Sequence, residues 1–276
     1  MKNFIIFLIF INNLFSLEKY KEENIRSIWN VEEKKLKLVE HRKLKGLEQL
    51  NNLKFHDELW KIISEFYPED VINRIDKFVV FSDNNKNNRN GMSGLIESVD
   101  GTNNSRFILS VDIADAYYGN KISLEVFLNL LVHEFFHLVS LNDTQISPNY
   151  TKGVKIYEGY TYESSYINKF YEKFWNNSLG KKLEMLELNS KLSFAQKETI
   201  REEIYRYNQD KFIDTYAMTN MVEDIAVSFE DFIRLNKGYL GDSLKDKKID
   251  FFYSYADLVK YKNHFIQKKK EMIRKY

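Results

Sequence analysis

Two histidines and a glutamate within one apolar stretch are the residues of this chain best placed to do chemistry. The stretch reads Leu130-Leu-Val-His133-Glu134-Phe-Phe-His137-Leu-Val-Ser140. If it is helical, His133 and His137 lie one turn apart on the same face, because residues i and i+4 are neighbours on a helix. Two imidazoles in this arrangement can bind one zinc ion, and Glu134 is placed to take a proton from a water on that ion. The motif therefore predicts hydrolytic metal chemistry.

The residues around the motif favour a buried helix. Residues 123–141 contain no Gly or Pro, and Ser123 is a suitable N-cap. Apolar side chains recur there at helical spacing, namely Leu124, Phe127, Leu128, Leu131, Phe135 and Leu138. The alternative is a core helix whose two histidines are merely satisfied by hydrogen bonds. A buried and unpaired Glu134 would then be costly, which favours the metal site.

The elements on either side of the motif predict an α+β fold, mostly α, with a small sheet beside the motif helix and extra helical layers. Strands are expected at 77–81, 94–99 and 106–113, the last two as a hairpin, and helices at 161–176, 183–208, 219–235 and 244–274. Residues 17–75, rich in Glu, Lys and Leu, are expected to form a separate N-terminal helical segment before a domain of residues 76–276. The 106–113 strand is expected to edge the cleft and bind substrate backbone by strand addition.

Composition narrows the class of protein and of metal site. With 276 residues, 43% of them hydrophobic, the chain can bury a sizeable core. The net charge of +1 gives no electrostatic sign of a nucleic-acid partner. The chain has no cysteine, so disulfides and thiolate ligands are excluded. Metal ligands must come from His, Asp and Glu, which fits a hydrolytic site better than a structural one.

The first sixteen residues have the layout of a signal peptide. A single lysine precedes an apolar block that ends near Ser16 and is too short for a comfortable membrane span. This predicts a secreted or periplasmic protein without a stable membrane span after cleavage. An uncleaved short anchor is the alternative, because Leu14 is large where a signal peptidase usually needs a small residue.

Catalytic zinc sites use three protein ligands, so the motif requires one more. Glu223 is the leading candidate, because it lies beside the apolar face of the expected 219–235 helix. A purely structural role is equally open on the residues alone: Asn220 could cap that helix, with Glu223 closing a capping box three residues later. The remaining histidines lie in charged contexts and are weaker candidates: His41, His56 and His264.

The pattern Tyr216-x-x-Thr-Asn220-x-x-Glu223 after an H-E-x-x-H motif resembles the gluzincin metallopeptidases related to anthrax lethal factor and the bacterial Pro-Pro endopeptidases. A closer resemblance is to a group of bacterial zinc-binding metallopeptidases. It rests on the segments 110–115, 133–142, 165–175, 215–226 and 248–259. The resemblance implies a zincin-like fold and zinc-dependent cleavage of a peptide or protein substrate. It further implies that Glu223 is the third zinc ligand and that Tyr216 faces the reacting carbonyl.

One position departs from the gluzincin pattern. Gluzincins commonly carry an acidic residue four positions after the ligand Glu, where it orients a ligand histidine, and this chain has Val227 there. Asp224 or a backbone carbonyl is expected to take over that role. The departure leaves two alternatives open: a zinc-binding scaffold that acts as a binding protein with little or no turnover, and a helical surface protein in which the motif is accidental.

Overall fold

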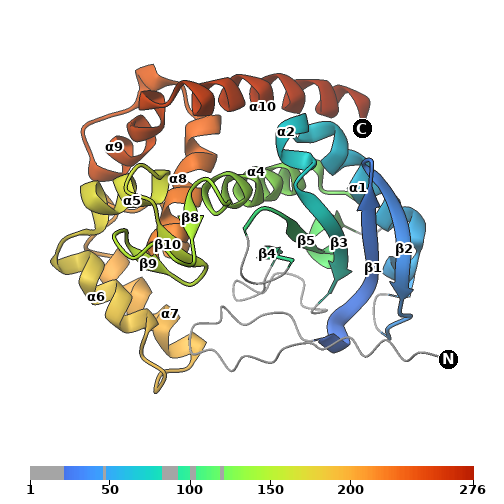
Figure 1. Ribbon diagram of the computed structural model, residues 1–276, viewed down its shortest axis with the longest axis horizontal. Coiled ribbons are helices and arrows are strands. Elements are labelled where there is room, and N and C mark those ends of the chain that lie inside the picture. Colours follow the sequence, from blue (N-terminus) through green and yellow to red (C-terminus); the bar gives the residue numbers. More distant parts are fainter. Residues whose placement is uncertain (1–21, 46–47, 83–92, 100–103, 119–120) are drawn as a thin grey trace.

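Five strands form one mixed sheet in the half of the molecule that contains the N-terminal part of the chain (Figure 1). The computed structural model describes residues 22–45, 48–82, 93–99, 104–118 and 121–276. The sheet order is β2-β1-β3-β5-β4, in which β3 and β5 are parallel and all other neighbours are antiparallel. The strands are β1 (Ile25–Glu32), β2 (Lys35–His41), β3 (Ile75–Phe81), β4 (Gly94–Ser98) and β5 (Phe107–Asp112).

The predicted N-terminal helical segment is wrong over residues 25–41, where the chain forms the β1–β2 hairpin. Its turn uses Glu33 and Lys34, both with positive φ (50° and 64°). Hairpin turns of this kind usually carry Asn or Gly, so the Glu-Glu-Lys-Lys sequence gave no turn signal. Because β1 also pairs with β3, the domain boundary expected near residue 75 falls within one continuous sheet.

The strand predicted to bind substrate is internal rather than exposed. β5 is flanked by β3 on one side and by β4 on the other, so its backbone groups are already paired. Within the described residues, the outermost strand of the sheet on this side is β4. The β4–β5 hairpin pairing itself is confirmed, and any added strand would have to pair with β4.

Helices make up most of the rest of the chain. Two of them follow the hairpin, α1 (Leu53–Phe66) and α2 (Glu69–Ile72), and the short α3 (Ile113–Ala116) leads to the motif helix α4 (Leu124–Ser140). The later helices are α5 (Tyr166–Phe170), α6 (Ser178–Glu187), α7 (Phe194–Tyr205), α8 (Met221–Arg234), α9 (Leu244–Phe251) and α10 (Ala256–Lys275). The chain is thus an α+β protein, mostly helical with a small mixed sheet, as the sequence predicted.

Two of the predicted helices are interrupted. The 183–208 helix is divided between α6 and α7 by a break at residues 188–193, where Ser193 begins α7 with a complete capping box. The 244–274 helix is divided by a turn near Tyr255 into α9 and α10.

The predicted loop 142–159 contains short strands of a second sheet: β8 (Ile146–Ser147), β9 (Lys155–Ile156) and β10 (Gly159–Thr161). A further two-stranded ribbon consists of β6 (Tyr117–Tyr118) and β7 (Lys121–Ile122).

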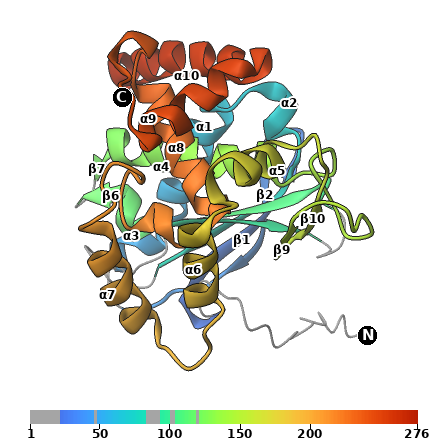
Figure 2. The same ribbon diagram turned by 90° about the vertical axis from the view of Figure 1, so that its left-hand side faces the viewer.

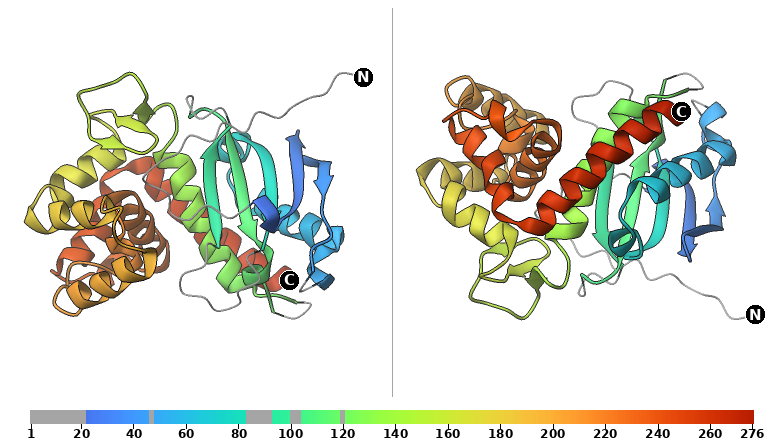
Figure 3. Two further views of the ribbon diagram at one scale, coloured as in Figure 1. Left: turned by 90° about the horizontal axis from the view of Figure 1, so that it is seen from below. Right: turned by 90° about the horizontal axis from the view of Figure 1, so that it is seen from above.

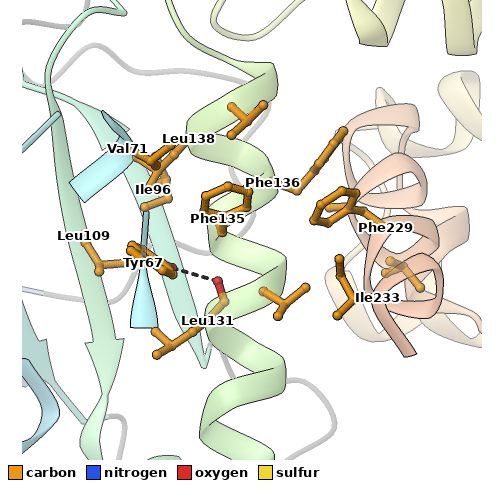
Figure 4. Packing of buried hydrophobic residues seen from close by; sticks show 14 of the residues in the cluster. Tyr67, Val71, Ile96, Leu109, Leu131, Phe135, Phe136, Leu138, Phe229 and Ile233 are labelled. Atoms are coloured by element: carbon orange, nitrogen blue, oxygen red, sulfur yellow. Dashed lines mark hydrogen bonds between the residues drawn. The ribbon is translucent and has the colours of Figure 1, made fainter. Parts of the chain in front are cut away.

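Helix α4 separates the sheet from the later helices, as the views from below and above show (Figure 3). One side of α4 packs against the sheet through Leu131 and Leu138, while Phe136 faces Phe229 of α8 on the other side (Figure 4). The hydroxyl of Tyr67 donates a hydrogen bond of 2.8 Å to the carbonyl oxygen of Leu131. α4 is therefore buried on both sides, which explains why its apolar residues cover more than one stripe.

The N-terminal predictions fall outside the described residues. The expected signal peptide of residues 1–16 lies there. No helix among the described residues is both long and apolar enough to cross a membrane.

Candidate metal centre

Three buried side chains from two helices meet at one point. His133 and His137 on α4 face Glu223 in the first turn of α8, and each side chain is at least nine-tenths buried. The Nε2 atoms of the two histidines are 3.0 Å apart. Oε2 of Glu223 lies 3.1 Å from Nε2 of His133 and 3.4 Å from Nε2 of His137. This buried His-His-Glu group can hold a metal ion.

The spacing of the three ligand atoms fits a single small cation. Atoms held about 2.0–2.1 Å from one tetrahedral zinc ion would be roughly 3.3 Å from each other, and the distances between these atoms fall around that value. Hydrogen bonding alone explains the arrangement poorly. Two imidazole nitrogens at 3.0 Å repel unless one carries a proton, and the carboxylate oxygen adds a third set of lone pairs.

Glu230 fixes which nitrogen of His133 can bind a metal. Its Oε1 lies 2.8 Å from Nδ1 of His133. A carboxylate at this distance keeps a proton on Nδ1, so Nε2 is the nitrogen that faces His137 and Glu223 and that can bind a metal in exchange for its proton. Glu230 is seven residues after Glu223 and lies on the same face of α8, because seven residues make nearly two full turns.

The expected substitute for the acid missing at Val227 is therefore wrong. Asp224 points away from the histidines into the core, where its Oδ2 accepts hydrogen bonds from Trp175 Nε1 (2.7 Å) and Lys248 Nζ (2.5 Å). Adjacent residues on a helix project about 100° apart, so Asp224 cannot follow Glu223 toward the metal centre. The orienting carboxylate comes from Glu230 instead, one turn beyond Val227.

The two roles left open for the 220–223 segment are both partly realised. Asn220 is the N-cap of α8, and its side-chain oxygen accepts hydrogen bonds from the backbone N–H groups of Val222 and Glu223. The carboxylate of Glu223, however, points at the histidines rather than back at Asn220. The cap thus sets the direction in which α8 begins, and this direction places the carboxylate of Glu223 beside the histidines.

Glu134 lies beside the edge strand. Its side chain is only 4% exposed, and its Oε2 has no hydrogen-bond partner among the described residues. β4 passes so close that a Cβ atom added to Gly94 would lie 2.6 Å from Oε1 of Glu134. The start of β4 and the side chain of Glu134 are therefore neighbours.

The pKa values of Glu134 and Glu223 are shifted in opposite directions, and this separates the roles of the two glutamates. Burial raises the pKa of Glu134, and the nearby His137 and His133 only partly oppose this, so Glu134 is a stronger base than an exposed glutamate. Burial would also raise the pKa of Glu223, but the positive charge of His137 and the hydrogen bonds from both histidines outweigh it and lower that pKa. For His133, burial lowers the pKa, but the hydrogen bonds to Glu223 and Glu230 outweigh it and hold that pKa well above its usual value.

Tyr216 lies at the same site. Its ring centroid is 5.8 Å from that of His133, and its hydroxyl interacts electrostatically with Glu223. Burial and the negative charges of Glu223 and Glu134 raise the pKa of Tyr216, so the hydroxyl stays protonated and can act as a donor. The ring is 41% exposed, which leaves it accessible to a ligand.

The other three histidines do not contribute ligands. His41 bonds to the carbonyl of Asn51, His56 is enclosed between Ser27 and Leu50, and His264 bonds to the carbonyl of Phe66.

Sequence reasoning missed Glu230, whose seven-residue spacing from Glu223 was the available signal. It also missed the proximity of Gly94 to Glu134, for which the sequence carries no signal.

Comparisons of the chain with protein-family models, with curated proteins and with solved structures give no match.

Proposed function

We propose that this protein is a zinc-dependent peptidase of the zincin type that works outside the cytoplasm. The observation that carries the proposal is the buried triad of His133, His137 and Glu223, with Glu134 on the same helix as an unpaired buried base. A donor set of two imidazoles and one carboxylate is typical of catalytic zinc sites, which keep a further position for water. The secreted or periplasmic location rests on the layout of residues 1–16.

Each residue of the site has a definite task in this proposal. Zinc held by the triad would supply a water of lowered pKa, near 7, and would polarise the substrate carbonyl. Glu134, with its raised pKa, accepts the proton of the attacking water and passes it to the leaving amine. Tyr216 donates a hydrogen bond to the carbonyl oxygen as negative charge develops there. Glu230 keeps His133 in the tautomer that binds metal.

The edge strand β4 offers a way to hold an extended peptide. Within the described residues β4 is the outermost strand on this side of the sheet, and its first residue, Gly94, lies against Glu134. A peptide that pairs with β4 would place its backbone beside the metal centre, with side chains alternating toward and away from the protein. This supports a peptide or protein as the substrate.

The binding-protein alternative loses the observation that favoured it. That alternative rested on the missing acid at Val227, and Glu230 now occupies the place from which His133 is oriented. We therefore retain the peptidase as the proposed function.

Two variants test the proposal. Glu134→Gln keeps all three ligands, so we expect normal zinc content by elemental analysis but no chelator-sensitive cleavage of a peptide library. Glu223→Ala removes a ligand and should lose most bound zinc. Cleavage by Glu134→Gln at the wild-type rate would refute the general-base role, and full zinc content in Glu223→Ala would return Glu223 to a structural role.

A further inference from the structure

The backbone of Gly94 lies against the outer half of the Glu134 side chain. A Cβ atom added to Gly94 would lie 2.6 Å from Oε1 of Glu134, 2.9 Å from its Cδ and 3.0 Å from its Cγ. Ile96, two residues further along β4, is buried between the sheet and α4, because alternate residues of a strand point to the same side (Figure 4). The position of Gly94 therefore limits the orientations open to the Glu134 carboxylate.

Ser93 holds this end of β4 through two hydrogen bonds. Its Oγ donates to Oδ2 of Asp115 at 2.6 Å, and its carbonyl oxygen accepts from the backbone N–H of Asp112 at 2.9 Å. The bond to Asp115 is charge-assisted and partly buried, and both properties strengthen it. Because Ser93 directly precedes Gly94, a shift of Ser93 would also move the backbone that lies against Glu134.

The short helix α3, which carries Asp115, connects the start of β4 to the start of the motif helix. α3 packs on α4, and the β6–β7 ribbon follows it (Figure 2). Asp112 caps α3, because its Oδ1 accepts a hydrogen bond of 2.7 Å from the backbone N–H of Ala114. The carbonyl oxygen of Ala116 accepts one of 2.9 Å from the backbone N–H of Ser123, the N-cap residue of α4. α3 is therefore hydrogen-bonded to both elements whose spacing places Gly94 beside Glu134.

A side-chain anchor has a large effect at this point because the end of an outermost strand opens easily. Terminal residues of an element open at free energies near zero, whereas core strands open only with the whole fold. Within the described residues β4 pairs with β5 alone, so its Gly94 end has a strand partner on one side. The Ser93–Asp115 bond adds a second anchor to the backbone bond with Asp112. It thereby keeps Gly94 close to Glu134.

We propose that Asp115 is a positioning residue of the metal centre, which acts through Ser93 to hold the start of β4 against Glu134. This inference rests on the proposed function, because it assigns the residue that orients the general base of that reaction. Loss of the bond should lower kcat, since Glu134 gains orientations from which it cannot take the proton of the attacking water. It should also raise KM, since β4 is the strand proposed to pair with the peptide. The three metal ligands lie on α4 and α8 and should keep their zinc.

Two single variants each remove one partner of the bond. Ser93→Ala removes the donor and Asp115→Ala the acceptor. Each should lower kcat about tenfold per zinc-loaded molecule on a fluorogenic peptide selected from the library, less than the roughly 100-fold of a 1 Å displacement, because the backbone bond to Asp112 remains. The double variant should be no worse than either single variant, because all three lose the same bond. Ser93→Thr keeps a hydroxyl and should restore most of the wild-type rate.

Hydrogen–deuterium exchange of the full-length protein measures the anchor without requiring turnover. Residues 94–98 should exchange faster in both single variants, while α4 exchanges as in the wild type. The matched control is Asp76→Ala. Asp76 on β3 accepts a hydrogen bond of 2.8 Å from Arg106, at the opposite end of β5 from Gly94. Its loss should change neither kcat nor exchange at residues 94–98.

Wild-type kcat in both single variants would overturn the positioning role and leave the peptidase intact. An equal loss of kcat in Asp76→Ala would also overturn it, because the effect would then be a general loss of stability. If the zinc-loaded wild type cleaves no peptide, the peptidase is refuted and exchange alone decides the anchor. Faster exchange at residues 94–98 in both single variants then supports it, and unchanged exchange overturns it.

Discussion

His133 is held by two carboxylates at once, and this double contact defines the metal centre at the scale of single residues. Glu230 binds its Nδ1 and Glu223 approaches its Nε2, so the ring can neither rotate nor change tautomer without losing a partner. An imidazole fixed in this way is a stronger ligand than a free one, because its basicity is raised and its orientation is already set. Glu230 therefore belongs to the site although it does not face the metal position.

Replacing Glu230 with Gln should weaken metal binding by about 10–100-fold, because the orienting negative charge is lost while the ligands remain. Competition with a fluorescent chelator measures this affinity. Asp231→Asn, which changes the next residue of α8 and affects only the two hydrogen bonds from Arg234, is the matched control. An unchanged affinity in Glu230→Gln would mean that α8 orients His133 by packing alone.

Gly94 is important for the site because it has no side chain to displace Glu134. Ala at this position would place a methyl group 2.6 Å from Oε1 of Glu134, closer than atoms can approach, so Glu134 or β4 must shift. Displacing a catalytic group by about 1 Å can cost on the order of 100-fold in rate. We expect Gly94→Ala to lose about that much peptidase activity at unchanged zinc content. Gly238→Ala, where no atom lies within 4 Å of the added methyl, should behave as wild type.

At the scale of elements, α8 positions the site because it is anchored at both ends. Its first turn is held through Asp224, which pairs with Lys248 of α9 inside the core. Its last turn is held by Lys262 of α10, whose Nζ donates to the carbonyl oxygens of Phe232 and Leu235. Burial lowers the pKa of Lys262 to about 8. Two buried lysines from later helices thus fix the direction in which Glu223 and Glu230 project.

His56 joins the first hairpin to α1 and makes this junction sensitive to acid. Its Nδ1 bonds to Ser27 of β1 and its Nε2 to the carbonyl of Leu50, and burial lowers its pKa to about 4. The unfolded pKa is about 6.5, so the unfolded state takes up a proton first as pH falls. The stability from neutral His56 is complete above pH 6.5 and is lost between pH 6.5 and 4, about 3 kcal/mol in all.

Urea unfolding of wild type and His56→Gln tests this junction. The glutamine variant should be less stable at pH 7, because the packing and hydrogen bonds of the ring are lost. At pH 5 the gap between the two proteins should shrink by about 2 kcal/mol, since wild type alone has lost the contribution of neutral His56. A gap that is the same at both pH values would contradict the lowered pKa.

At the scale of the whole molecule, the metal centre lies where two halves of the structure meet. α4 is packed on the sheet, whereas α8 belongs to the later helices, and the triad takes ligands from both (Figure 3). A metal bound there crosslinks elements about 90 residues apart in the chain. It should therefore stabilise the entire fold rather than one helix.

Chelation should lower the melting temperature by about 10 °C when free zinc had been present at about a thousand times its Kd. Differential scanning calorimetry with and without chelator measures the shift. Glu134→Gln retains every ligand and should show the full shift, whereas Glu223→Ala should show little. An unchanged melting temperature of the wild-type protein after chelation would contradict metal binding at this site.

The sequence by itself determined the α+β class, the motif helix and the later helix that carries Glu223, because helices and strands follow from spacing within single segments. On the residues alone, the role of Glu223 as a ligand stayed open. Helical period is a local property that residues 123–141 and 219–235 display without their neighbours, and the Asn220 cap of the second segment is local as well, whereas Ser123 stands at the N-cap of α4 without a capping hydrogen bond. The β1–β2 hairpin was missed because its positive-φ turn is made by Glu33 and Lys34, which are not residue types that predict such a turn.

Only the tertiary structure decided which side chains meet the motif from elsewhere. The crossing of α8 over α4 brings Glu230 rather than Asp224 to His133. The order of strands likewise made β4, not β5, the edge beside Glu134. These contacts join residues that are 40 to 97 positions apart, and their geometry is set by packing in the shared core, which no local pattern encodes.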